Sequence, residues 1–296
     1  MSRPKIVEAV KEGRVLVSDG AWGTVLQQKG LRPGECPELW NVEKPDAVLD
    51  VAKAYIEAGA DMIQADSFGG TAFKLQHFHQ GLESRVAEIN EAASKISREA
   101  AGDSNWTIPS VGPTGVMLMM GEVSEEALYE GFKEQMVALE KGGADAFCIE
   151  TMSALDEALV AVRAAKENCS CEIICTFTFD KTSKGYRTMM GVSPGDFAKS
   201  MVEAGVDIIG TNCGNGIAGM IEIVREMRQV DKDIPILVHA NAGLPKNVSG
   251  VDVFPEGPEE MAAQVPQLVE AGANIVGGCC GTTPAHISAI KKAIQG

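Results

Sequence analysis

The chain lacks several features that would place it in a membrane or mark it for export. None of its apolar runs approaches the roughly 20 residues that a membrane-spanning helix needs. Its first residues, MSRPKIVEAVKEGRVLV, are interrupted by charges and do not form the apolar segment of an export signal. We therefore expect a cytoplasmic protein that does not act at a membrane.

Basic and aromatic residues are also scarce. The 296 residues include 26 Lys and Arg against 41 Asp and Glu, which gives a net charge of -15. No basic stripe is present to hold phosphates, and this argues against a nucleic-acid partner. With only 3 Trp and 3 Tyr, few aromatic faces are available to a cationic ligand. Eight cysteines without an export signal indicate free thiols rather than a disulfide framework.

One phrase recurs along the chain. Each copy ends an amphipathic helix with glycine and then begins an apolar run, a pattern typical of a helix followed by a buried parallel strand. The four copies are EAGADMIQADS (57–67), KGGADAFCIET (141–151), EAGVDIIGTNC (203–213) and EAGANIVGGCC (270–280).

Four further strands are predicted between these copies, which makes eight. They lie at residues 14–20, 107–113, 172–179 and 235–243. Helical spacing of apolar residues predicts helices at 46–58, 83–100, 125–142, 154–166, 195–204, 217–230, 258–271 and 285–294.

Eight alternating units without a break in composition predict one (β/α)8 TIM barrel over residues 1–296, preceded by a short N-terminal helix. An open doubly wound sheet is the alternative. It is less favoured because no glycine-rich phosphate loop follows the first strand.

In a barrel, the carboxyl ends of the strands meet at the mouth where active sites form. The polar and thiol residues expected there are Asp19, Asp66, Glu150, Cys213, Asn241, Cys279 and Cys280.

Three of these residues are cysteines from two strand ends. Neighbouring side chains of a regular strand point to opposite faces, so Cys279 and Cys280 can share a partner only if the backbone leaves that geometry. The glycines of GGCCGTTP permit this departure. Together with Cys213 they predict a zinc site with three sulfur ligands and one open position. A buried apolar pair and a redox couple are the alternatives.

A zinc ion with three thiolates is a poor generator of hydroxide but a good anchor for a substrate thiol, which ionises when it coordinates. The expected chemistry is alkyl transfer to sulfur. Glu150 is a candidate partner for a substrate ammonium, or else a carboxylate satisfied within the barrel. Asp19 opens the DGAWGT turn, whose amides suit a substrate carboxylate, and it either fixes the turn or assists the ammonium.

The motifs DGAWGT, CIET, GTNC, HANAGLP and GGCCGTTP resemble the homocysteine S-methyltransferase family in order and spacing. That family includes the homocysteine domain of cobalamin-dependent methionine synthase and betaine–homocysteine methyltransferase. The resemblance implies that Cys213, Cys279 and Cys280 bind zinc, which carries the homocysteine sulfur. It also implies that Glu150 and Asp19 help bind the amino acid and that Asn241 lies beside the site.

The chain departs from the family pattern in two places, and both concern the methyl donor. Asp66 in ADSF stands where many members have TNTF, and Trp22 replaces a smaller residue or Met. The chain ends at Gly296 without a segment expected to carry a donor. We expect a methylated corrinoid on a separate protein, with S-methylmethionine or betaine as the alternative and Trp22 as the face that such a cation would contact. A non-catalytic barrel that binds zinc or homocysteine is the alternative from another class.

Overall fold

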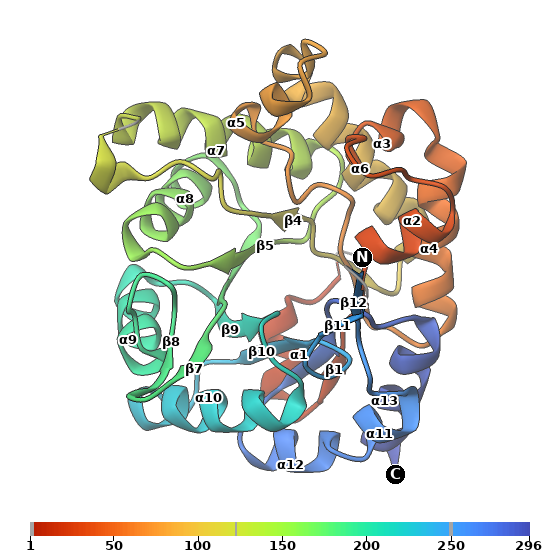
Figure 1. The fold of residues 1–296 in the computed structure, drawn as a ribbon, viewed down its shortest axis with the longest axis vertical. Helices are drawn as coiled ribbons and strands as arrows, with labels where there is room; N and C mark the ends of the chain where they lie inside the picture. Colours follow the sequence, from red (N-terminus) through yellow and green to blue (C-terminus); the bar gives the residue numbers. More distant parts are fainter. Residues whose placement is uncertain (1–2, 122, 249–250) are drawn as a thin grey trace.

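The computed structural model describes residues 3–121, 123–248 and 251–296. Parallel strands surround the centre and helices form an outer ring (Figure 1). The strands at the eight predicted positions are β1 (Leu16–Val17), β2 (Met62–Ile63), β3 (Trp106–Thr107) with β4 (Ser110–Val111), β5 (Ala146–Met152), β6 (Glu172–Phe177), β9 (Ile208–Asn212), β10 (Ile236–Ala240) and β13 (Ile275–Gly278).

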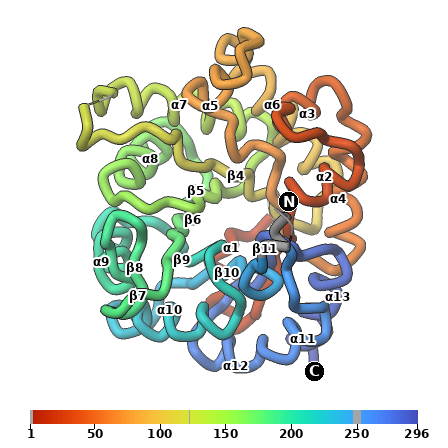
Figure 2. The backbone as a smooth tube through the Cα atoms, in the orientation of Figure 1, coloured from red at the N-terminus to blue at the C-terminus, as the bar shows by residue number. Residues whose placement is uncertain are grey.

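Seven of these strands form one curled parallel sheet in the order β1-β13-β10-β9-β6-β5-β4. The first strand lies beside the last, and Figure 2 shows the blue C-terminal segment alongside the red and orange N-terminal one. Strand β2 pairs with β3 in a separate two-stranded unit. The α/β barrel fold is therefore confirmed, although its backbone ladder does not run unbroken around the ring.

The third predicted strand is divided at Pro109, which has no N–H to donate to a ladder. On either side of it the pairing continues: Ile108 N donates to Ile63 O at 2.8 Å, and Cys148 N donates to Pro109 O at 2.9 Å. The strand thus passes from one neighbour to the other at this point.

The large helices lie where their periodicity predicts them. They are α4 (Pro45–Glu57), α6 (Val86–Ala101), α7 (Glu125–Lys141), α8 (Leu155–Asn168), α9 (Pro194–Ala204), α10 (Ile217–Val230) and α13 (Pro284–Gln295). The helix predicted at 258–271 is instead divided into α11 (Pro258–Ala262) and α12 (Val265–Glu270). Pro266, in the first turn of α12, accounts for the break because its ring cannot continue a helix from the preceding turn.

The predicted N-terminal helix is confirmed as α1 (Ile6–Lys11). Several short elements of the connections were not predicted. They are α2 (Gly23–Gln28), α3 (Trp40–Glu43), α5 (Ala72–Leu75), the 3-10 turns η1 (Gln76–Phe78), η2 (Leu82–Ser84) and η3 (Leu118–Met120), and the hairpins β7 (Asp180–Thr182) with β8 (Gly185–Arg187) and β11 (Lys246–Val248) with β12 (Val251–Val253).

The fifth residue of each repeated phrase joins the start of its strand to the strand before it through two reciprocal hydrogen bonds, which we call a clasp. Val17 N donates to the Asp61 carboxylate at 2.8 Å, and Asp61 N donates back to Val17 O at 2.7 Å. This clasp joins β1 to β2, where the ladder is missing. The same reciprocal bonds join Thr107 with Asp145, Ile173 with Asp207 and Ile236 with Asn274.

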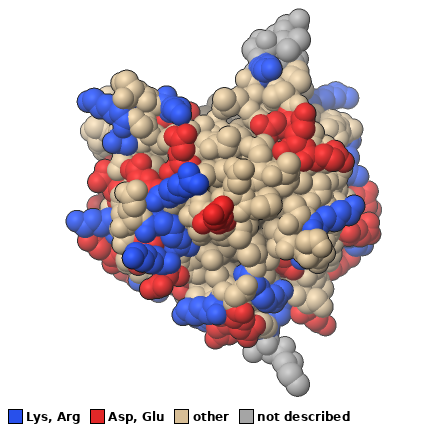
Figure 3. Space-filling view, turned by 90° about the horizontal axis from the view of Figure 1, so that it is seen from below, with Lys and Arg blue, Asp and Glu red and all other residues tan. Residues whose placement is uncertain are grey.

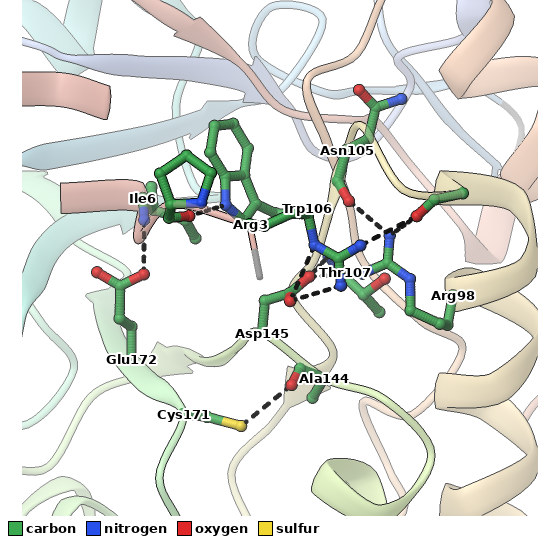
Figure 4. Close-up of polar contacts among 12 residues, drawn as sticks. Arg3, Ile6, Arg98, Asn105, Trp106, Thr107, Ala144, Asp145, Cys171 and Glu172 are labelled. Carbon is green, nitrogen blue, oxygen red and sulfur yellow. Dashed lines mark hydrogen bonds and ion pairs between the residues drawn. The ribbon is translucent and has the colours of Figure 1, made fainter. Parts of the chain in front are cut away.

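Helix α1 closes the end of the barrel opposite the mouth. Its buried residues Ile6, Ala9 and Val10 pack against apolar side chains from the starts of the strands. Glu172 on β6 accepts hydrogen bonds from the backbone N–H of Ile6 at 2.6 Å and Val7 at 3.1 Å. Figure 4 shows the bond between Ile6 and Glu172 beside the ion pairs that Asp145 makes with Arg3 and Arg98.

Among the described residues, every helix is too short or too polar to cross a lipid bilayer. On the face seen in Figure 3, acidic and basic side chains are interspersed.

Replacing Glu172 with alanine should release α1. The change leaves the buried N–H of Ile6 and the partly buried N–H of Val7 without their charged acceptor, which we expect to cost about 1.5–3 kcal/mol. Hydrogen exchange at Ile6 and Val7 should accelerate, and the urea midpoint should fall. Glu12→Ala, at an exposed residue following the same helix, is the matched control. Unchanged exchange in Glu172→Ala would contradict this account of the closure.

Candidate metal and substrate site

Cys213 follows β9 in a backbone conformation that residues other than glycine seldom adopt. Its φ is 59°, and such a left-handed conformation costs about 1–3 kcal/mol unless its surroundings enforce it. Cys213 N donates to His239 O at 3.0 Å, and Gly214 continues the turn with φ of 70°. The turn lifts the thiol out of the strand and over the barrel mouth.

Glycines let the two adjacent cysteines leave β13. Gly278 N donates to Asp19 O at 2.8 Å, and Cys279 N donates to Ala240 O at 2.7 Å. A side chain on Gly278 would overlap Thr282, whose hydroxyl donates to Cys279 O at 2.7 Å. The backbone is therefore packed too closely for any residue but glycine, and regular alternation of side chains ends there.

The three thiols predicted as ligands lie together at the mouth. The Sγ atoms of Cys213 and Cys280 are 3.9 Å apart, and those of Cys279 and Cys280 are 4.0 Å apart. All three atoms lie within 4.8 Å of one another. Zinc–sulfur bonds of about 2.3 Å at tetrahedral angles place sulfurs about 3.8 Å apart. The spacing therefore fits one tetrahedral metal ion with three of its positions filled.

The thiols also influence one another's protonation. Hydrogen bonds from Cys279 and Cys280 lower the pKa of Cys213, and hydrogen bonds with Cys213 and Cys280 raise the pKa of Cys279. Asn241 contributes a side-chain hydrogen bond that further favours the Cys213 thiolate. Asn241 is itself buried, and its part in binding substrate stays a prediction.

Glu150 lies at the end of β5 beside a break in the strand register between Ile149 and Met152. One of its oxygens accepts hydrogen bonds from Ser110 Oγ and from Gln64 Nε2, the latter at 3.0 Å. Burial raises the pKa of Glu150 to about 7. Its charge therefore lacks a full counterion, although the carboxylate is held in place.

Asn212 is a site residue that the sequence analysis missed. Its side chain donates to Glu150 at 3.3 Å and to Thr151 Oγ1 at 2.8 Å, while its oxygen accepts from Thr151 N at 2.9 Å. These bonds stabilise Thr151 at φ of 61°, an unusual value for a β-branched residue. The sequence feature that could have identified Asn212 is its position in GTNC, directly before the predicted ligand Cys213.

Asp19 serves the turn rather than the open cavity. It is fully buried, and one of its oxygens accepts from Trp22 Nε1 and from Gln64 N, each at 2.8 Å. Burial raises the pKa of Asp19 to about 7. These bonds join the DGAWGT turn to the residue after β2, while a contact of Asp19 with a substrate ammonium stays a prediction.

A cavity of about 390 Å³ opens at this place. Trp22, Glu150, His239 and the three cysteines line it, and so do residues 20–24 of the DGAWGT turn and residues 64–68 that follow β2. Asp66 and Glu38 lie in its wall, whereas Lys and Arg are missing from the described residues that line it. The cavity thus offers thiols and carboxylates, a set of groups that attracts cations.

A model of the homocysteine S-methyltransferase family matches residues 16–294. The chain belongs to this family. The predicted family is thereby confirmed, and the match covers every strand that contributes to the cavity.

Curated relatives extend well beyond this chain. Methionine synthase of Mycobacterium tuberculosis is 29% identical over 95% of the chain, and that of Mycobacterium leprae is 28% identical over 95%. The chain spans about a quarter of the length of these relatives.

The metallated form of the Escherichia coli homocysteine methyltransferase MmuM superposes with a TM-score of 0.79 at 23% identity. This alignment covers 96% of the present chain and 98% of the other. At this identity the likeness shows a shared fold.

Replacing Cys279 with alanine should reduce zinc binding from about one equivalent per chain to well below that, because one of three soft ligands is lost. The barrel should stay folded, since its core does not depend on the metal. Metal analysis and thermal melting check both points, and we expect the same of Cys213→Ala and Cys280→Ala. The buried Cys175, which lies within β6, provides a matched Cys→Ala control. Full zinc content in Cys279→Ala would refute the ligand assignment.

Proposed function

We propose that the protein transfers a methyl group to the thiol of homocysteine and produces methionine in a zinc-dependent reaction. The observation that carries this proposal is the convergence of three thiols, at spacings near those of a tetrahedral site, in a cavity that also holds a fixed carboxylate. The names of the relatives, methionine synthase and homocysteine methyltransferase, support the same reaction.

In this proposal Cys213, Cys279 and Cys280 hold the zinc ion. When bound, zinc supplies the Lewis acidity that keeps a coordinated substrate thiol ionised at neutral pH. Three protein ligands would leave a tetrahedral ion one position for a substrate thiol. Asn241 supports the Cys213 thiolate, while Asn212 joins the Cys213 turn to the strand end that carries Glu150.

The amino-acid part of homocysteine is assigned to two places. Glu150 receives the ammonium, which supplies the counterion that this buried carboxylate lacks. The backbone of the turn after β1, which Asp19 and Trp22 hold in shape, receives the carboxylate. A molecule with a thiol, an ammonium and a carboxylate thus meets all three groups at once.

Homocysteine binding to the zinc form should release a proton, because the thiol must ionise to coordinate. Calorimetry in buffers of different ionisation enthalpy measures this release without any turnover. The zinc-free protein is the control. Equal release with and without zinc would rule out thiol activation by the metal.

Glu150→Gln should weaken homocysteine binding while zinc content stays unchanged. Loss of a charge-assisted contact to the ammonium predicts about a tenfold to hundredfold rise in Kd. Selectivity over a thiol without the amino group should fall in parallel. An unaltered homocysteine Kd would leave Glu150 with a purely structural part.

Two classes of donor fit the open mouth. From the sequence we expect a methylated corrinoid on a separate protein, and exposed Met119, Met120 and Met189 on the surrounding loops suit contact with a large apolar ring. A small sulfonium or quaternary ammonium is the alternative, and the absence of Lys and Arg among the described lining residues favours it. Turnover with methylcobalamin, S-methylmethionine and betaine separates the two. A non-catalytic binding barrel would bind homocysteine and transfer methyl from none of them.

A further inference from the structure

Two carboxylates of the cavity are left without a part in zinc or homocysteine binding. Glu38 lies ahead of α3 and Asp66 lies after β2, and both line the cavity that contains the three cysteines. Their side chains are 4% and 5% exposed, so both are removed from bulk water. Buried carboxylates require partners, and those of Glu38 and Asp66 differ.

Glu38 has neutral partners that fix its position. Its Oε1 accepts from Gly69 N at 2.6 Å, and its Oε2 accepts from Cys36 Sγ at 3.3 Å. Burial and the negative charge of Glu38 and Asp66 raise the pKa of the Cys36 thiol, so Cys36 remains a hydrogen-bond donor. These contacts orient the carboxylate without neutralising its charge.

Asp66 is the unsatisfied member of the pair. Its Oδ2 has no hydrogen-bond partner, although its backbone oxygen accepts from Asn41 Nδ2 at 2.7 Å. Burial and the neighbouring charge of Glu38 raise the pKa of Asp66 well above its usual range. A cation beside Asp66 would supply the missing partner and lower the cost of two adjacent negative charges.

The surroundings indicate what kind of cation the pair accepts. Trp22 and Phe68 line the same cavity, and Phe68 is 38% exposed. Aromatic faces with carboxylates suit a methylated onium ion, whose charge is spread over apolar groups. The homocysteine ammonium is already assigned to Glu150, so a second positive charge has to come from another molecule.

We propose that Asp66 and Glu38 form the subsite for the positive charge of the methyl donor, a sulfonium or quaternary ammonium ion. The inference rests on the proposed function and selects the second of its two donor classes. In the reaction, the bond from the methyl carbon to the donor sulfur or nitrogen breaks, and its electron pair stays on the neutral leaving group. The homocysteine thiolate forms the new carbon–sulfur bond, so the donor cation and the thiolate both lose their charge.

This loss of charge determines how the pair acts. The attraction of Asp66 for the donor is strongest before transfer and weakens as the methyl group moves. Asp66 and Glu38 are therefore binding residues that lower the KM of the donor and do not raise kcat. If Asp66 and Glu38 had only a structural role, their replacement would change the donor KM, kcat and the affinity for homocysteine together.

The test uses Asp66→Asn, which removes the charge and keeps the shape. Calorimetric titration of the zinc-loaded protein with S-methylmethionine and with betaine should show that at least one of them binds. In the variant its Kd and its KM should rise about tenfold to hundredfold. Zinc content and the Kd of homocysteine should stay near the values of the unmodified protein, and kcat should not fall, because the lost attraction is weaker in the transition state.

Two comparisons separate this proposal from its alternatives. Asp180→Asn, at an exposed residue that lines the neighbouring cavity, is the matched control and should change nothing. Methylcobalamin is a donor without an onium charge, so any turnover that it supports should be equal in Asp66→Asn and the unmodified protein. If Asp66→Asn does not fold, Asp66→Ser provides the same loss of charge in a smaller side chain.

Failure of both onium ions to bind the unmodified protein, or an unchanged donor Kd in Asp66→Asn, would overturn the donor subsite. The same holds if Asp66→Asn weakens the binding of homocysteine and leaves that of the donor unchanged. The proposed function would survive these results as long as homocysteine still releases a proton on binding to the zinc form. Absence of that release would instead overturn the proposed function itself.

Discussion

The architecture depends on the reciprocal clasp between an Asp or Asn at the start of one strand and the backbone of the strand before it. Asp61, Asp145, Asp207 and Asn274 each hold two strands in register at the end of the barrel opposite the mouth. Because register is fixed there, the other end is free to depart from regular geometry. The left-handed residues Thr151 and Cys213 and the register break in β5 lie at that other end.

The barrel mouth also contains several buried carboxylates. Asp19 and Glu150 have pKa values near 7 because desolvation outweighs their hydrogen bonds. Burial, together with the neighbouring charge of Glu38, also raises the pKa of Asp66. With no Lys or Arg among the described residues of the cavity wall, positive charge has to arrive from outside. A metal ion and cationic parts of small molecules are suited to supply it.

The repeated phrase and the helical periodicity were sufficient to predict the strands, the larger helices and the three converging thiols. Some features depended on contacts distant in sequence, which a pattern cannot reveal. Asn212 matters because it reaches Glu150, 62 positions away. The interruption at Pro109 depends on which neighbours the strand has, and the division of α11 from α12 on how the chain turns at Pro266. Both hairpins were missed because their strands are only three residues long.

The clasps also divide the molecule into quarters. Each quarter contains two successive strands of the ring and the helix between them. The strand pairs are β1 with β2, β3 and β4 with β5, β6 with β9, and β10 with β13, and each pair is joined by its own Asp or Asn. The contacts from one quarter to the next are ladder bonds, helix packing and single side-chain contacts such as the ion pair of Lys291 with Asp61, and among the described residues none of them is such a reciprocal clasp. For protein engineering this predicts where the chain tolerates new ends: a circular permutant opened between quarters keeps all four clasps, whereas one opened within a quarter separates a strand from its partner.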